Sequence, residues 1–142
     1  MRIVLGVAAV SALAAALFVS TPATAGLGVH STNGVGTAGG TVAVNALEPG
    51  IGSVVVNGTS YTVTCMQVSP SQATPGGTHD VFISAITVTA DGTTQKVFIR
   101  IVDTPTGPDL LGYNFVGLTF GIACDADQNV VPVTSGGYTT LP

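Results

Sequence analysis

The chain has 142 residues, of which only 7% are charged, and its formal net charge at pH 7 is −4. Ordinary soluble surfaces carry about 25–35% charged residues, so Thr, Ser, Asn and Gly must cover most of this one. Only three basic residues occur, which excludes a phosphate-tracking nucleic-acid surface and a polybasic patch for a membrane surface.

The first 25 residues have the pattern of an export signal. Arg2 supplies the positive start, residues 3–19 are uncharged and apolar, and Ala23-Thr24-Ala25 presents small residues at a cleavage site. The pattern predicts a signal peptide over residues 1–25, cleavage after Ala25, and a secreted or cell-wall-associated protein with no membrane contact afterwards. An uncut membrane anchor is the alternative, but a spanning helix needs about 20 apolar residues and this run is shorter.

Residues 26–40 follow the signal and contain six glycines without periodicity. Because glycine-rich segments behave as flexible chains, we predict a flexible Gly-rich arm over residues 26–40 and a single β-domain over residues 41–142. Residues 41–46 alternate apolar and polar types and predict the first strand. The arm and this strand could pair with the sheet edge of a neighbouring molecule, so a self-assembling surface subunit is one alternative; an ordinary strand in its own sheet is preferred.

Two β-hairpins are indicated by turn dipeptides. Asn57-Gly58 separates two alternating segments, and both residue types take the positive φ angles of a type I′ turn. Cys65 ends the second of these segments in phase with Val63, so both side chains are expected to face the core. The second hairpin is predicted to join residues 81–89 to residues 94–102 through Asp91-Gly92.

The C-terminal third is also predicted to be extended. Residues 103–109 contain two prolines, which exclude a central strand and indicate a turn. Residues 113–124 are predicted as a strand that places Cys124 inward, and residues 130–133 and 138–141 as short terminal strands. No stretch has helical periodicity. We therefore predict an all-β fold, an antiparallel sandwich or small barrel after a cleaved signal peptide.

The two cysteines, Cys65 and Cys124, both lie in the part of the chain predicted to be exported. In an oxidising compartment such a pair usually becomes a structural disulfide, which is the prediction here. Free thiols or a metal site are the alternatives. A zinc site takes four ligands, whereas this chain offers two separate Cys and two scattered His.

No catalytic signature is visible in the sequence. His79 and Asp80 are adjacent, so they point to opposite faces of a strand, and His79 is interpreted as a surface histidine at a strand start. No Gly-x-Ser-x-Gly nucleophile elbow occurs. We expect a protein that is not an enzyme and uses no cofactor; a small secreted hydrolase that uses His79 or a pair of Asp residues is the less favoured alternative.

One acidic segment partly matches a calcium loop. Asp125, Asp127 and Asn129 supply oxygen ligands in the order of the first positions of such a loop. Val130 stands where the loop needs glycine, and Gly136 where it needs a bidentate glutamate. The segment is interpreted as a polar turn and gives only a weak calcium candidate in a chain otherwise expected to bind no metal.

Two aromatic residues give the best candidate for a ligand contact. Tyr113 and Phe115 lie on one face of a predicted strand and are followed by small residues at alternate positions. Such a strip could stack against a sugar or an apolar ligand, with cell-wall glycan as one candidate partner. Burial of the strand on both faces is the preferred alternative.

A short segment resembles a known group of proteins. Residues 97–103, followed by Pro105, Gly107, Pro108 and Asp109, resemble a strand and turn found in small exported β-domain proteins of actinobacteria. The resemblance implies an exported β-domain and transfers no site residues. We therefore expect a secreted or envelope-associated, non-enzymatic β-domain with a binding or structural role.

Overall fold

The computed structural model describes residues 30–69, 77–117, 124 and 128–141. The predicted signal peptide lies outside these residues. Within them no helix is present, and so none that is long and apolar enough to span a membrane. The described chain forms nine strands: β1 (Ser31–Thr37), β2 (Thr41–Leu47), β3 (Ile51–Val56), β4 (Thr59–Val68), β5 (His79–Val88), β6 (Thr94–Asp103), β7 (Leu110–Val116), β8 (Val131–Pro132) and β9 (Ser135–Leu141).

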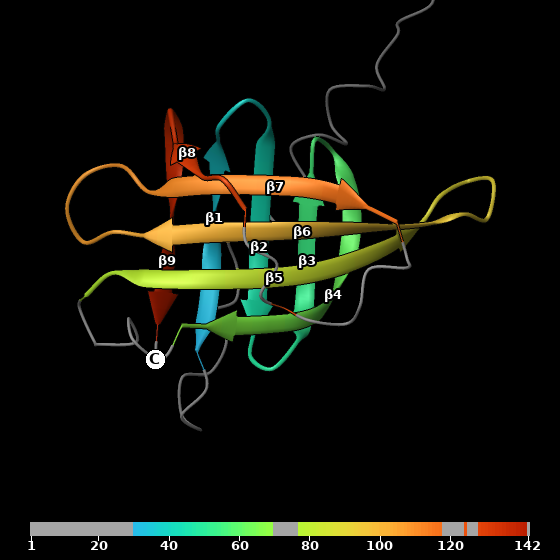
Figure 1. The fold of residues 1–142 in the computed structure, drawn as a ribbon, viewed down its shortest axis with the longest axis horizontal. Coiled ribbons are helices and arrows are strands. Elements are labelled where there is room, and N and C mark those ends of the chain that lie inside the picture. Colours follow the sequence, from blue (N-terminus) through green and yellow to red (C-terminus); the bar gives the residue numbers. More distant parts are fainter. Residues whose placement is uncertain (1–29, 70–76, 118–123, 125–127, 142) are drawn as a thin grey trace, which may run out of the picture.

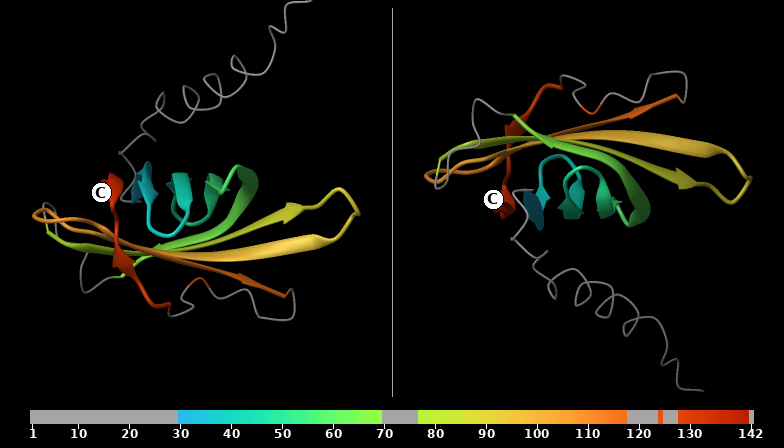
Figure 2. Two further views of the ribbon diagram at one scale, coloured as in Figure 1. Left: turned by 90° about the horizontal axis from the view of Figure 1, so that it is seen from above. Right: turned by 90° about the horizontal axis from the view of Figure 1, so that it is seen from below.

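All nine strands belong to one antiparallel sheet in the order β8-β7-β6-β5-β4-β3-β2-β1-β9. Each strand from β1 to β8 pairs with its neighbour in sequence, and β9 returns to pair with β1. Strands β5, β6 and β7 run across β1, β2 and β3 (Figure 1). The sheet curls, so that these two groups of strands form two facing layers (Figure 2). The predicted all-β antiparallel fold is confirmed, as a single curled sheet that forms a half-barrel.

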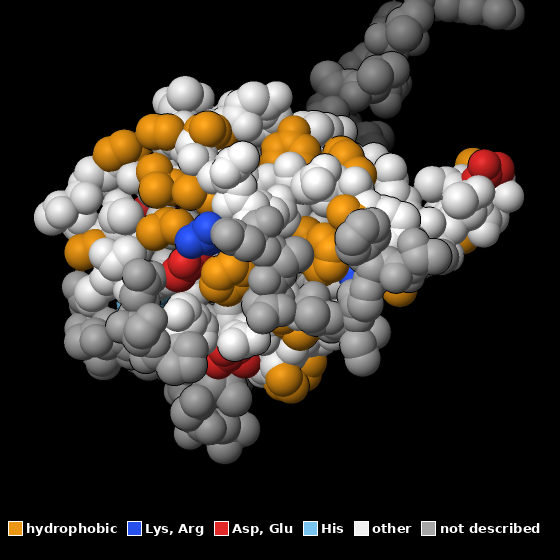
Figure 3. All heavy atoms as spheres, viewed as in Figure 1, with side chains coloured by type: hydrophobic (Ala, Val, Ile, Leu, Met, Phe, Trp, Pro, Cys, Tyr) orange, Lys and Arg blue, Asp and Glu red, His pale blue; other side chains and the backbone are white. Residues whose placement is uncertain are grey.

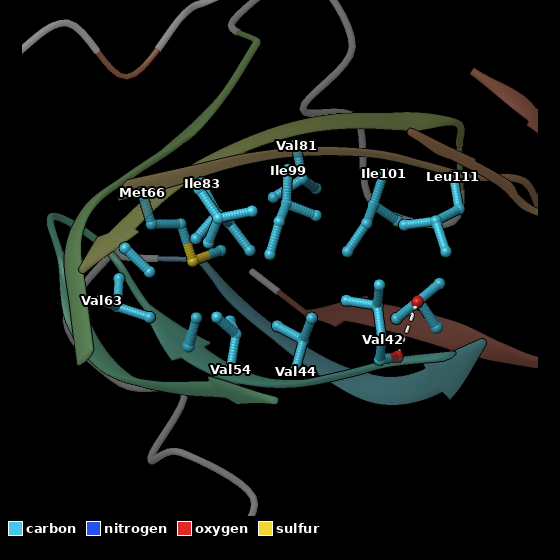
Figure 4. Packing of buried hydrophobic residues seen from close by; sticks show 14 of the residues in the cluster. Val42, Val44, Val54, Val63, Met66, Val81, Ile83, Ile99, Ile101 and Leu111 are labelled. Carbon is cyan, nitrogen blue, oxygen red and sulfur yellow. Dashed lines mark hydrogen bonds between the residues drawn. The ribbon is translucent and has the colours of Figure 1, made fainter. Parts of the chain in front are cut away.

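The core fills the concave side of this sheet. Valines of β2 and β3, such as Val44 and Val54, point toward isoleucines of β5 and β6, such as Ile83 and Ile99 (Figure 4). All four are at most 1% exposed. Alternate residues of each strand point inward, as the two-residue period of a strand requires. The hydroxyl of Tyr138 on β9 donates a hydrogen bond to the carbonyl oxygen of Val42 at 2.8 Å and closes one end of this core.

The predicted hairpins and turns are confirmed. Asn57 and Gly58 have φ angles of 50° and 86°, as a type I′ turn requires, between β3 and β4. The second hairpin joins β5 to β6, and the proline-containing segment lies in the connection from β6 to β7. Strand β7 ends at Val116; the rest of the longer strand predicted up to residue 124 falls largely outside the described residues.

The prediction of a flexible arm over residues 26–40 is wrong for residues 31–37. These form β1, which pairs along its whole length with β2 on one side and β9 on the other. Its glycines allow close packing. A Cβ on Gly34, whose φ is +151°, would lie 2.7 Å from the Cα of Tyr138, and one on Gly36 would lie 2.7–2.9 Å from the Tyr138 ring. Glycine is required here because another chain segment approaches the backbone, so glycine content alone was misleading.

The position of β1 and β2 also bears on the self-assembly alternative. That alternative needs residues 26–46 to add a strand to a neighbouring molecule. In the structure both backbone edges of β1 and of β2 are occupied within the same sheet. The preferred interpretation, that residues 41–46 form an ordinary strand in their own sheet, is confirmed.

The expected inward orientation of Cys65 is wrong because β4 contains a bulge. The register with β5 shifts between Val63 and Cys65. Before the shift Tyr61 and Val63 are buried, and after it Met66 and Val68 are buried instead. One extra residue in a strand reverses the faces of all later side chains, so Cys65 points away from the core.

Candidate ligand-binding site

Three aromatic rings meet on the concave side of the sheet, from strands that face each other. Tyr61 comes from β4, and Tyr113 and Phe115 come from β7. The Phe115 ring lies 5.9 Å from Tyr113 in an edge-on arrangement and 6.3 Å from Tyr61. Both separations suit favourable aromatic contacts. We call these three residues the aromatic cluster.

The three rings differ in their access to solvent. Phe115 is 42% exposed, Tyr113 is partly buried against the core, and Tyr61 is 3% exposed. Phe115 therefore offers the surface of the cluster that a ligand can reach, while the two tyrosines support it from below.

Uncharged polar groups surround the aromatic cluster. The hydroxyl of Tyr61 donates to Gln95 Oε1 at 2.7 Å, and Asn57 Nδ2 donates to the hydroxyl oxygen of Tyr113 at 3.2 Å. Asn57 Oδ1 in turn accepts the backbone N–H of Thr41 at 2.9 Å. Burial raises the pKa of Tyr61, so this hydroxyl stays protonated at neutral pH. The site therefore combines one accessible ring with amides and hydroxyls of fixed orientation, and its chemistry suits an uncharged ligand that carries hydroxyl groups.

An open hollow of about 510 Å³ lies at the β5–β6 hairpin beside this site. Gln95, the partner of Tyr61, lines it, as does Val116, the residue after Phe115. Asp91 at the hairpin tip accepts hydrogen bonds from the Thr89 hydroxyl and the Thr93 N–H. These bonds hold the pKa of Asp91 at about 2. The hollow thus adds hydroxyl groups and one carboxylate at the end of the aromatic cluster.

Sequence reasoning found part of this site. The structure brings Tyr113 and Phe115 together, as predicted, and leaves Phe115 exposed, whereas the preferred alternative was burial. Tyr61, Gln95 and Asn57 were not predicted as site residues. The alternation of the strand before the bulge predicts that Tyr61 points inward, but its contact with the Phe115 ring on β7 depends on the curl of the sheet.

The two histidines form a different, partly buried cluster with acidic residues. His79 is 3% exposed and points inward from β5, so its assignment to the surface is wrong. Its Nδ1 lies 4.0 Å from Asp103 Oδ2, and its ring lies 6.4 Å from that of His30. His30 Nδ1 in turn lies 2.7 Å from Glu48 Oε2.

This cluster has the character of a structural element. Burial would raise the pKa of Glu48, but hydrogen bonds from the N–H groups of His30 and Val68 and from the His30 ring lower it overall. Glu48 therefore fastens the start of β1 to the end of β4 as a carboxylate. Within the described residues His79 Nε2 has no hydrogen-bond partner. A hydrolase that used His79 would need a route for substrate to a side chain that is 97% enclosed.

Two aspartates hold the outer edge of β9. Asp109 Oδ2 accepts the N–H of Tyr138 at 2.6 Å, and Asp103 Oδ2 accepts the N–H of Thr140 at 2.5 Å. Asp109 Oδ1 also accepts the N–H of Thr104 within the β6–β7 turn at 2.9 Å. Carboxylates thus take the place of a further strand for the N–H groups of Tyr138 and Thr140 at this edge.

The disulfide joins Cys65 and Cys124, as predicted, with Cα atoms 5.5 Å apart. Cys124 is buried, whereas Cys65 is on the outer side of β4. On the same side Arg100 forms a paired hydrogen bond with Asp80, at 2.9 and 2.7 Å, and also donates to the carbonyl oxygen of Gln128 at 3.2 Å. Cys124 and Gln128 are therefore both held against the outer face of the sheet. A buried disulfide is consistent with an oxidising or extracellular environment.

The calcium candidate falls mostly outside the described part of the chain. Asp125 and Asp127 are not described, and Asn129 is exposed. Among residues 30–69, 77–117, 124 and 128–141 no group of three or more His, Cys, Asp or Glu side chains is arranged to hold a metal ion.

No family model, curated protein or solved structure matches this chain significantly.

Proposed function

We propose that this protein is an exported, non-enzymatic binding domain that contacts a neutral carbohydrate through Phe115 and its neighbours. The observation that carries the proposal is the aromatic cluster, in which one ring is 42% exposed and its partners hold uncharged amides and hydroxyls in fixed positions. Sugar rings present apolar C–H faces to aromatic rings and hydroxyls to amides. The pattern of residues 1–25 and the buried disulfide support export to the envelope or the medium.

Binding is tested by retention of the folded, disulfide-bonded protein on neutral and anionic cell-wall polysaccharides. Phe115→Ala should weaken retention about two- to tenfold, because an aromatic contact contributes about 0.5–1.5 kcal/mol. Tyr113→Phe keeps the ring but removes the hydroxyl that Asn57 contacts, so it separates stacking from hydrogen bonding. Val131→Ala is the matched control, because Val131 is 51% exposed on β8 and lies outside the aromatic cluster. Equal retention of wild type and Phe115→Ala on every polysaccharide would refute the proposal.

Export has its own measurement. Mass spectrometry of culture supernatant and washed cell wall, without reducing agent, should find a chain that begins at Gly26 with Cys65 and Cys124 oxidised. Recovery of the intact chain only inside cells would contradict the export part of the proposal.

A further inference from the structure

One half of the molecule carries no charge on its strands. Strands β9, β1, β2, β3 and β4, which are adjacent in the sheet and described in full, contain no Asp, Glu, Lys, Arg or His. A surface of ordinary composition would carry a charged residue at about one position in three or four. The Asp, Lys, Arg and His side chains that lie on strands belong to β5 and β6, and Figure 3 shows charged side chains on the opposite, β5–β7 side. The uncharged half therefore needs an explanation beyond solubility.

The strand register arranges the outward side chains of this half in rows. Asn33 on β1 pairs with Asn45 on β2 and with Thr139 on β9, and the same row continues through Ser53 on β3 to Thr62 on β4. Every member carries a hydroxyl or an amide, and none is buried. We call this set the polar row: Thr139, Asn33, Asn45, Ser53 and Thr62.

Apolar side chains flank the polar row on both sides. Two positions along the strands in one direction lie Leu47 on β2 and Ile51 on β3, and in the other direction lie Val35 on β1 and Val55 on β3. Ile51 is 62% exposed and Val35 is 42% exposed. A line of hydrogen-bonding groups therefore runs across five strands, and its central part on β1, β2 and β3 is flanked by these apolar side chains.

We propose that the polar row binds a single extended chain of a neutral polysaccharide, laid across the strands. Adjacent strands are about 4.7–4.9 Å apart, which is close to the length of one sugar ring along an extended β-linked glycan. Hydroxyl and amide groups would therefore recur about once per sugar. The apolar margins suit the C–H edges of the rings. Because these strands carry no charge, a neutral polymer can cover them without burying an unpaired charge. An anionic polymer would have no Lys or Arg side chain on these strands to pair with.

The shape of the sheet argues against a second copy of the chain as the occupant. The outer side of a curled sheet is convex (Figure 2). Two convex faces touch over a small area, whereas a stable protein–protein interface buries about 800 Å² per partner. A single flexible polymer chain can follow one row over the curve.

This inference deepens the proposed function, because it names a polymeric ligand, but it stands on different residues. The polar row lies on the outer side of the sheet, and the aromatic cluster lies on the concave side. Substitutions can therefore test the two surfaces separately.

The test uses the exported, oxidised full-length mature protein and its retention on powdered chitin and cellulose, with polygalacturonate as the anionic comparison. Asn45→Lys puts a charge at the centre of the polar row, and Thr62→Lys puts one at its exposed end. Val131→Lys adds the same charge at an exposed position on β8. Thermal unfolding of each variant identifies any that fail to fold.

We expect Asn45→Lys and Thr62→Lys each to weaken retention on a neutral polymer at least about tenfold, and Val131→Lys to change it less than about twofold. Equal retention of all three folded variants would overturn the polar-row proposal, whatever the effect of Phe115→Ala. If only Phe115→Ala lowers retention, the aromatic cluster binds the polysaccharide and the polar-row proposal is overturned. A change of oligomeric state with Asn45→Lys, without a change in polysaccharide retention, would also overturn the proposal.

Discussion

The hydrogen bonds that Asp109 accepts at the outer edge of β9 give the sharpest stability prediction. Asp109 is 9% exposed and accepts two backbone N–H groups, from Tyr138 on β9 and from Thr104 in the turn. Asp109→Ala leaves both donors without this acceptor. An unsatisfied buried donor costs about 1–3 kcal/mol, and the partly buried N–H of Thr104 costs less because water reaches it more easily. We expect a loss of about 2–4 kcal/mol of unfolding free energy, which is large against a total of about 5–15 kcal/mol.

Asp109→Asn refines this prediction. An amide has one acceptor oxygen, so it can serve only one of the two N–H groups, and its NH2 then faces the other donor. We therefore expect Asp109→Asn to lower the unfolding free energy, but by less than Asp109→Ala does. Asp91→Ala is the control, because Asp91 also accepts an N–H group, that of Thr93, but is fully exposed at a hairpin tip. Its effect on stability should be much smaller.

The assay is urea unfolding of the oxidised protein, together with amide hydrogen exchange. With a urea slope of about 2 kcal/mol per molar, the middle of the usual range, Asp109→Ala should lower the midpoint by about 1–2 M. The Tyr138 amide should exchange faster, with less change at Thr140, whose acceptor is Asp103. An unfolding free energy within about 0.5 kcal/mol of wild type, the range of ordinary surface substitutions, would refute this account of the edge.

Two further predictions concern pH and the disulfide. Burial raises the pKa of Asp103 above its ordinary value of 3.8, nearby Asp109 adds to this, and the Thr140 N–H only partly offsets it. The folded state therefore takes up the proton at a higher pH than the unfolded chain does. This residue's contribution to stability should increase as pH falls through its folded pKa toward 3.8, and Asp103→Asn should flatten that increase in a pH series of urea melts. Removing the disulfide with Cys65→Ser and Cys124→Ser should cost about 4 kcal/mol for a sequence separation of 59 residues, measured by the same melts; an unchanged midpoint would show that the link does not restrict the unfolded chain.

Local signals in the sequence were reliable for elements and turns. The Asn57-Gly58 turn, the β5–β6 hairpin and the proline turn before β7 each depend on residues that are close in the chain, and all are confirmed. The prediction of a flexible arm was wrong for residues 31–37 because glycines occur both in flexible chains and in tightly packed strands. Only contact with Tyr138, about a hundred residues later in the chain, distinguishes the two.

Only the part of the candidate site that lies on a single strand could be predicted from the sequence. Tyr113 and Phe115 are two residues apart, so their shared face follows from the period of a strand. Tyr61 and Asn57 join them because the sheet curls and brings β4 and the β3–β4 turn to β7. Likewise, the Asn and Thr residues of the polar row are separated by many residues and line up only through the register.

The short strands with Gly, Asn and Pro turns, the small number of charges and the single pair of cysteines can all be read from the amino-acid sequence. These properties follow from composition and from interactions between near neighbours. Only the folded sheet shows which strands pair, where a single bulge turns Cys65 outward, how the two histidines meet, and that five uncharged strands lie side by side. The physical reason is that pairing and register are set by burial of a common core, and a shift of one residue reverses the face of every side chain that follows.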